Sequence, residues 1–266
     1  MLASSPTIEY PFWGFVLSVL LFGVLLVQTW RYYSDYGKDR WYLRVFVAVL
    51  FLLSCTSTAM HIAVAHSLLF LAADFKAVNF LDAYSPFMTA DNVIICFVLF
   101  LIQLFFLSRI YFLRPNRHWI LGALVLCSIG TFVTGIVTCV LKTPSKQMIS
   151  WTVLYGLAMF SDAVTATYYW WIFAQSRSDF RQTKNILKRL RLYTAARGLL
   201  VTVAQTICFV LRVVQPHQLR WVLMHWNLSG ICVFATVALL NARGALREKM
   251  NEEISWDVAS QIEFSC

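Results

Sequence analysis

Among the ionisable side chains inside long apolar stretches of this chain of 266 residues are His61, Asp91, Asp162 and His225. Placing such a group within a membrane span is costly, and the groups kept there commonly bind a ligand, an ion or one another. We therefore treat these four residues as candidate ligand-binding residues. His61, Asp91 and His225 are expected to approach one another in the outer half of the membrane. The alternative is that they only bond neighbouring helices together.

Further polar side chains recur at the spacing of a single helical face around these residues. The four faces are Ser54, Thr58 and His61; Tyr155, Asp162, Thr165 and Tyr169; Tyr193, Arg197 and Gln205; and His225, Ser229, Cys232 and Thr236. Because lipid offers no hydrogen bonds, each face should point into a helical bundle. For the hydroxyl groups we favour simple hydrogen bonds between helices over a ligand site.

Asp162 and Arg197 are expected to lie at similar depths in two consecutive helices. An isolated charge inside a span costs several kcal/mol, so the sequence predicts a structural ion pair between them. In the alternative arrangement, Arg197 extends to the lipid headgroups and Asp162 stays protonated.

Motifs for metal binding and catalysis are missing from the sequence. His61 and His66 are separated by about 140° around a helix, so they cannot hold a metal from one face. The chain has no Cys-x-x-Cys, His-Glu-x-x-His or Gly-x-Ser-x-Gly motif, and no lysine between residues 221 and 242 for a retinal Schiff base. We therefore predict no catalytic residue, no metal and no cofactor.

The elements that position these residues are seven stretches long enough to cross a bilayer as helices. They cover residues 12–30, 45–73, 86–113, 118–141, 151–175, 190–211 and 221–242. The predicted fold class is therefore all-α, a polytopic membrane bundle of seven helices over residues 1–247. Residues 248–266 form a short acidic cytoplasmic tail, either disordered or a single surface helix. All six prolines are expected at or beyond span ends, with Pro86 beginning the third span.

Basic residues predict how the bundle is oriented. Lys and Arg concentrate on alternate connections, most densely in the fifth, where six of them form a predicted cytoplasmic basic loop: Arg177, Arg181, Lys184, Lys188, Arg189 and Arg191. By the positive-inside rule the amino end lies outside and the carboxyl end inside. Because this rule and anionic lipid account for the net charge of +9, we expect no nucleic-acid partner. The basic loop is a candidate surface for a cytoplasmic protein partner.

Several motifs in the second half of the chain resemble one known family. Asp162, the segments 176–183, 190–194 and 198–200, and the closing segment 240–247 are similar to basidiomycete fungal membrane proteins named only as domain of unknown function 6534. The resemblance implies a seven-helix membrane protein and brings no activity. Asn241 and Arg243 match the family and would act as a helix stop at the inner end of the last span. Arg197 departs from the family pattern, which has Thr at that position.

These observations predict a multi-pass protein in contact with the lipid bilayer, in either the plasma membrane or an endomembrane. The leading functional hypothesis is a receptor-like sensor that binds a small apolar or amphipathic ligand in an outer-half cavity. A transporter or lipid-handling protein is the second hypothesis, favoured by the polar faces and opposed by the lack of prolines within spans. A membrane-embedded enzyme is the third.

Overall fold

The computed structural model describes residues 6–263 except residue 38 and the short segments 71–76, 114–117, 142–143, 176–180 and 215–219. Within the described part the chain is all-α. It contains seven helices: α1 (Pro6–Asp35), α2 (Trp41–Phe70), α3 (Ala77–Leu113), α4 (His118–Val140), α5 (Pro144–Gln175), α6 (Arg181–Val214) and α7 (Arg220–Glu263). The predicted all-α class and the seven helices are confirmed.

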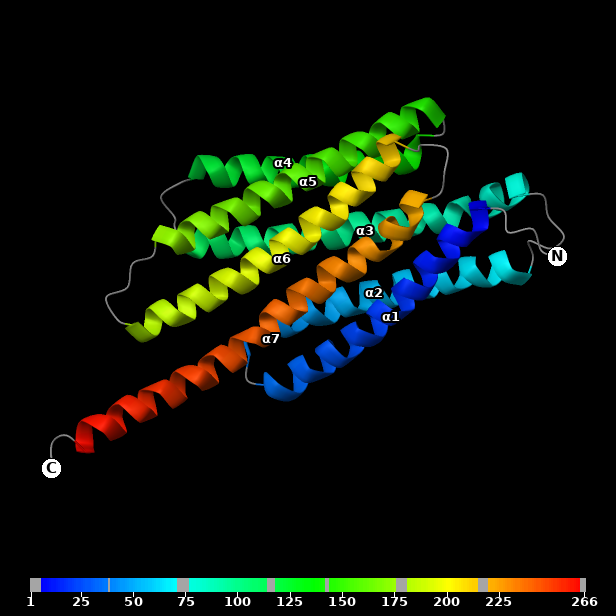
Figure 1. Ribbon diagram of the computed structural model, residues 1–266. Coiled ribbons are helices and arrows are strands. Elements are labelled where there is room, and N and C mark those ends of the chain that lie inside the picture. Colours follow the sequence, from blue (N-terminus) through cyan, green and yellow to red (C-terminus); the bar gives the residue numbers. More distant parts are fainter. Residues whose placement is uncertain are drawn as a thin grey trace.

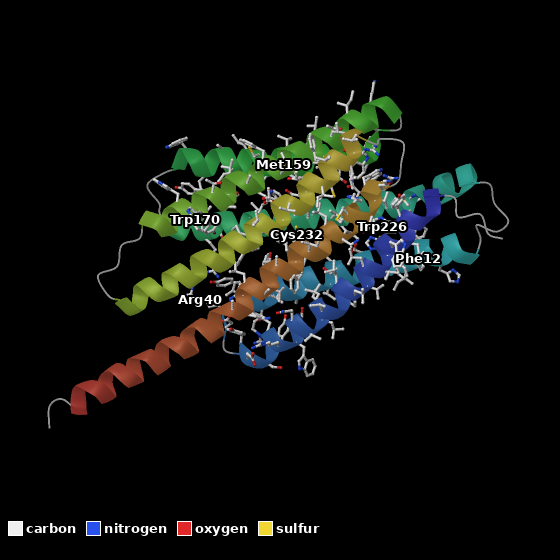
Figure 2. All side chains as sticks on the ribbon, viewed as in Figure 1. Phe12, Arg40, Met159, Trp170, Trp226 and Cys232 are labelled. Atoms are coloured by element: carbon white, nitrogen blue, oxygen red, sulfur yellow. The ribbon has the colours of Figure 1, made fainter. Side chains whose placement is uncertain are left out.

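The helices form one bundle in which successive helices run in opposite directions (Figure 1). Each helix packs against its neighbours in the chain, and α1 closes the ring against α7. Helices α3 and α7 also pack against each other. Side chains fill the space between the helices, with Cys232 of α7 at the centre (Figure 2).

The surface of the bundle is apolar and its interior holds polar groups. Trp30, Leu126 and Val140 are 75%, 70% and 71% exposed, whereas Asp162 and Gln205 are buried. This distribution suits a bundle surrounded by lipid, which can solvate apolar side chains but not polar ones. Six helices, all except α5, contain a described stretch long and apolar enough to cross a membrane. The chain is therefore a helical multi-pass membrane protein.

Small residues let pairs of helices approach closely. A Cβ added at Gly198 of α6 would lie 2.6 Å from the Cβ of Ala166 of α5, and one added at Gly135 of α4 would overlap the Sγ of Cys96 of α3. Close contact through small residues is a common means of helix association in membranes, where burial of apolar surface offers little driving force.

Several helices extend beyond the predicted spans. Helix α3 begins at Ala77, so Pro86 does not begin it but lies inside it, and Pro11 lies inside α1. Both prolines nevertheless lie at the start of a candidate membrane span, Tyr10–Asp35 in α1 and Pro86–Tyr111 in α3, as expected for prolines at span ends. Pro86 is the tenth residue of α3, where it removes one backbone hydrogen bond of the helix.

Two polar segments are also helical. Helix α6 begins at Arg181, so most of the predicted basic loop forms its first turns, and α7 continues through the acidic tail to Glu263. Both segments are rich in good helix formers such as Lys, Arg, Glu and Leu, which explains why the helices do not stop at the edge of the apolar span. In Figure 1 the carboxyl-terminal part of α7 projects beyond the rest of the bundle.

Candidate functional site

His61 of α2 and Asp91 of α3 form a buried hydrogen-bonded pair. Their Nε2 and Oδ2 atoms are 2.9 Å apart, and the two side chains are 2% and 3% exposed. Ser18 of α1 lies 2.9 Å from the Nδ1 of His61, and Ser57 of α2 donates a hydrogen bond to the Oδ1 of Asp91. These four residues, which we call the His61–Asp91 network, connect three helices through consecutive hydrogen bonds. A polar network of this kind holds the helices in one register.

An apolar layer lies one helical turn from the network. Trp226 of α7 stacks on the His61 ring with 4.9 Å between centroids and an interplanar angle of 24°. Val64, Val222 and Trp226 form a small buried cluster against which Phe15 and Met88 pack. Phe15, Val64 and Met88 are each three residues from Ser18, His61 and Asp91, on the side nearer the start of α1. The layer therefore covers the network toward that end of the bundle.

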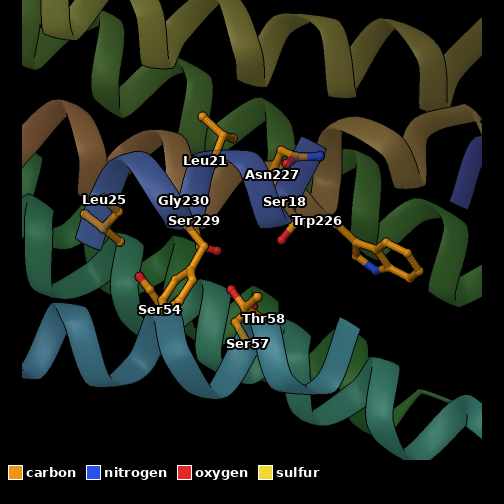
Figure 3. Close-up of a pocket in the computed structure, with 11 residues that line it drawn as sticks. Ser18, Leu21, Leu25, Ser54, Ser57, Thr58, Trp226, Asn227, Ser229 and Gly230 are labelled. Carbon is orange, nitrogen blue, oxygen red and sulfur yellow. The ribbon is translucent and has the colours of Figure 1, made fainter. Parts of the chain in front are cut away.

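A small polar cavity lies between α1, α2 and α7, beside the network (Figure 3). Its volume is about 10 Å³ and its lining includes Ser18, Ser57 and Ser229. The Oγ of Ser54 and the Oδ1 of Asn227, both from lining residues, are buried with no hydrogen-bond partner in the protein. A polar space of this size holds about one water molecule. It is far smaller than the sites that bind drug-sized ligands.

His225 of α7 belongs to a different set of contacts. Its Nδ1 lies 2.8 Å from the hydroxyl of Tyr155 of α5, and its ring packs edge-on against Trp151 with 5.0 Å between centroids. His225 is 5% exposed, so neither candidate histidine faces lipid. The structure thus brings together His61 and Asp91, whereas His225 bonds to Tyr155 rather than to either of them.

Asp162 of α5 is bonded by two glutamines. Gln205 of α6 donates to its Oδ2 at 2.9 Å, and Gln103 of α3 donates to its Oδ1 at 3.5 Å. Asp162 is therefore a second buried polar centre that joins three helices.

The predicted ion pair between Asp162 and Arg197 is not formed as a contact. No ion pair within 4.0 Å joins these two described residues, and the Arg197 guanidinium lies over the Phe106 ring, 3.8 Å from its centroid. The Arg197 Nε is buried without a hydrogen-bond partner. The physical reason is that the amide groups of the two glutamines donate hydrogen bonds to the Asp162 carboxylate, while the face of the Phe106 ring attracts the Arg197 guanidinium.

Asn241 does not stop α7, because the helix continues past it. Its Nδ2 instead donates to the backbone oxygen and to the Oε1 of Gln28 of α1, at 2.9 and 2.7 Å. Tyr36 donates to the Asn241 carbonyl at 2.6 Å. The prediction of a helix stop is wrong, and Asn241 instead joins α7 to α1.

Three residues of these networks were not predicted from the sequence: Ser18, Ser57 and Gln103. Ser57 lies one helical turn before His61, a spacing that could have revealed it. Ser18 and Gln103 are isolated polar residues in apolar stretches, and their role depends on which helices become neighbours.

The remaining predicted residues give less information. In the described part of the chain, no group of three His, Cys, Asp or Glu residues lies close enough to hold a metal ion. Arg177 lies outside the described residues. Arg181, Lys184, Lys188, Arg189 and Arg191 lie in the described backbone of α6, but their side chains lie outside the described part. The partner surface assigned to them stays a prediction.

Comparisons with curated proteins and with solved structures give no match. The family comparison matches the part of the chain that holds Asp162, Arg197, Gln205 and Asn241. Residues 158–245 match the model of the Family of unknown function (DUF6534), and this match confirms the family resemblance seen in the sequence.

Proposed function

We propose that this protein is a receptor-like membrane sensor whose responsive element is the His61–Asp91 network. The single observation that carries this proposal is the hydrogen-bonded His61–Asp91 pair, buried within two helices that are apolar enough to cross a membrane. Such a pair is costly to bury, and its replacement by apolar residues would often be neutral for stability or even stabilising. A role beyond stability accounts for its presence.

The ligand proposed for the sensor is small and amphipathic. The apolar layer around Trp226 and Val64 suits the apolar body of such a molecule, and the adjacent imidazole and carboxylate suit its polar group. The cavity of about 10 Å³ is too small for this ligand, so binding requires the helices to separate around the network. Since Ser18, His61 and Asp91 come from three helices, a ligand that replaces one of their hydrogen bonds would shift these helices relative to one another.

The proposed topology has seven spans, with the amino end outside and the carboxyl end inside. In this orientation the His61–Asp91 network lies in the outer half, where an external ligand arrives. The first turns of α6 lie at the opposite membrane face, where their basic residues would meet a cytoplasmic protein.

Mass spectrometry of small molecules that co-purify with the protein tests the sensor proposal. Wild-type protein should retain a small molecule that Trp226→Ala and Asp91→Leu lose, because one variant removes the apolar wall and the other the polar anchor. Trp30→Ala is the matched control, since Trp30 is 75% exposed on the bundle surface. Size-exclusion profiles establish that each variant is folded. Identical small-molecule profiles in wild-type protein and in folded binding-site variants would contradict the proposal.

A transporter is the second candidate, and the small polar cavity favours it. The unpartnered oxygens of Ser54 and Asn227 suit a water molecule or a small cation on a pathway between helices. Solute and proton flux into vesicles that contain the purified protein separates the two functions, since a sensor produces no flux.

A further inference from the structure

A groove on the outside of the bundle lies between α2 and α3, at the end where α2 begins and α3 ends. Its volume is about 530 Å³. Leu43, Phe46, Leu101, Leu104 and Phe105 provide its apolar lining, and Arg40, Tyr42, Ser108 and Arg109 provide its polar lining. The groove is large enough for part of an extended amphiphile.

The apolar part of the groove belongs to helix segments that are long and apolar enough to cross a membrane. It is formed by the candidate spans Trp41–His66 of α2 and Pro86–Tyr111 of α3. Its floor contains the stacked rings of Phe46 and Phe105, 4.7 Å apart, and Leu104 is 37% exposed beside them. Apolar side chains exposed on such segments contact lipid chains, so the natural occupant of this part is an acyl chain.

The polar part of the groove is cationic. Neither Arg40 nor Arg109 forms an ion pair with a carboxylate in the described part of the chain. The Arg40 guanidinium donates to the Tyr42 hydroxyl at 3.4 Å, and that of Arg109 lies 5.2 Å from the centroid of the Phe105 ring. Both cations thus keep donors that can bond an anion at the edge of the apolar lining.

We propose that this groove is a binding site for one anionic phospholipid of the surrounding leaflet. The phosphate group binds between Arg40 and Arg109, the Tyr42 hydroxyl donates a further hydrogen bond, and an acyl chain lies along Phe46, Leu101 and Leu104. An anionic headgroup is favoured over a zwitterionic one because the groove presents two cations and no carboxylate. A free phosphate ion would leave the apolar lining unoccupied. An acidic protein segment would have to enter the hydrocarbon, where its backbone groups have no partners.

Native mass spectrometry of the full chain tests this site with phosphatidylserine and phosphatidylcholine that carry the same acyl chains. Wild-type protein should bind one phosphatidylserine with roughly tenfold or higher preference over phosphatidylcholine. The double variant Arg40→Gln/Arg109→Gln should lose this preference. Arg40→Lys/Arg109→Lys should keep most of it, which separates loss of charge from loss of fold.

Two further variants and one competitor complete the experiment. Arg31→Gln is the matched control, because Arg31 is an exposed arginine on α1 outside the groove, and it should leave the preference unchanged. Leu104→Trp should weaken the binding of both lipids, because the larger ring fills the groove. Inorganic phosphate at the lipid concentration should not compete. Equal binding of both lipids by the wild-type chain, or an unchanged preference in Arg40→Gln/Arg109→Gln, would overturn the proposal.

Discussion

Burial determines how much the hydrogen bond between His61 and Asp91 contributes to stability. In water a histidine and an aspartate at this separation would gain little from each other, whereas here both are almost fully buried and each has a serine on its remaining side. Removing one partner leaves a buried polar group without its bond. Replacing both by apolar residues removes that penalty.

A double-mutant cycle measures this dependence. We expect His61→Phe and Asp91→Leu each to lower the free energy of unfolding in detergent by about 2 to 3 kcal/mol. The double variant should be less destabilised than the two single effects combined, by about 1 kcal/mol or more. The exposed pair Arg31 and Asp35, 3.4 Å apart on α1, provides the control cycle, in which coupling should stay below about 1 kcal/mol. Additive effects at His61 and Asp91 would show that the pair does not act as one unit.

A second double-mutant cycle tests whether Gln205 or Arg197 interacts with Asp162. In the structure Gln205 contacts Asp162, whereas the Arg197 guanidinium lies over Phe106. The effects of Asp162→Leu and Gln205→Leu on the free energy of unfolding should therefore be coupled by about 1 kcal/mol or more. Coupling of Asp162→Leu to Arg197→Met should be weaker, because no direct contact is lost. Thermal unfolding of the purified variants gives both values. Stronger coupling of Asp162→Leu with Arg197→Met than with Gln205→Leu would support the ion pair predicted from the sequence.

The sequence shows which polar residues are buried more reliably than it shows their partners. Asp91, Asp162, His61 and His225 were all expected in the bundle interior, and each is 5% exposed or less. Partners depend on the rotation and depth of each helix, and a shift of one residue turns a side chain by about 100°. For that reason periodicity placed Arg197 and Gln205 on one face without showing which of them reaches Asp162.

At the scale of the element, close approach between α5 and α6 depends on one position. Gly198→Ala should lower the free energy of unfolding by about 1 to 3 kcal/mol, because the new Cβ would lie 2.6 Å from that of Ala166. Gly122→Ala of α4 is the matched control, since nothing lies within 4 Å of its added Cβ. There the better helix propensity of alanine should leave stability unchanged or raised by up to about 1 kcal/mol. Chemical unfolding of both variants in the same detergent gives the two changes in free energy. Equal changes for Gly198→Ala and Gly122→Ala would mean that α5 and α6 do not approach closely at Gly198.

Helix ends were harder to predict than helix positions, and α3, α6 and α7 show why. The hydrophobic pattern reports only the part of a helix that lies in hydrocarbon, about 20 residues. Helix α7 has 44 residues, and its polar continuation is supported by helix propensity rather than by apolar burial. Sequence hydropathy therefore predicted the six helices that are apolar enough to cross a membrane but could not show where the helices end.

At the scale of the whole molecule, the number of crossings determines where the termini lie. An odd number places them on opposite sides of the membrane, and an even number places them on the same side. Six helices are long and apolar enough to cross a membrane, and α5 is the seventh helix, whose crossing the composition leaves open. Helix α5 packs against both α4 and α6, and its buried Tyr155 and Asp162 bond to α7 and α6. These contacts favour α5 as a seventh spanning helix, because a helix at the membrane surface could not reach both partners in the bundle interior.

Tags on the two termini test this arrangement. In sealed vesicles of known orientation, the amino-terminal tag should be accessible from the outer side only and the carboxyl-terminal tag from the cytoplasmic side only, as the distribution of basic residues requires. A third tag in the segment 176–180, between α5 and α6, should share the side of the carboxyl end, because two further crossings separate them. Both terminal tags on the same side would mean that α5 does not cross. Opposite sides with the orientation reversed would retain seven crossings but place the His61–Asp91 network in the cytoplasmic half, away from an external ligand.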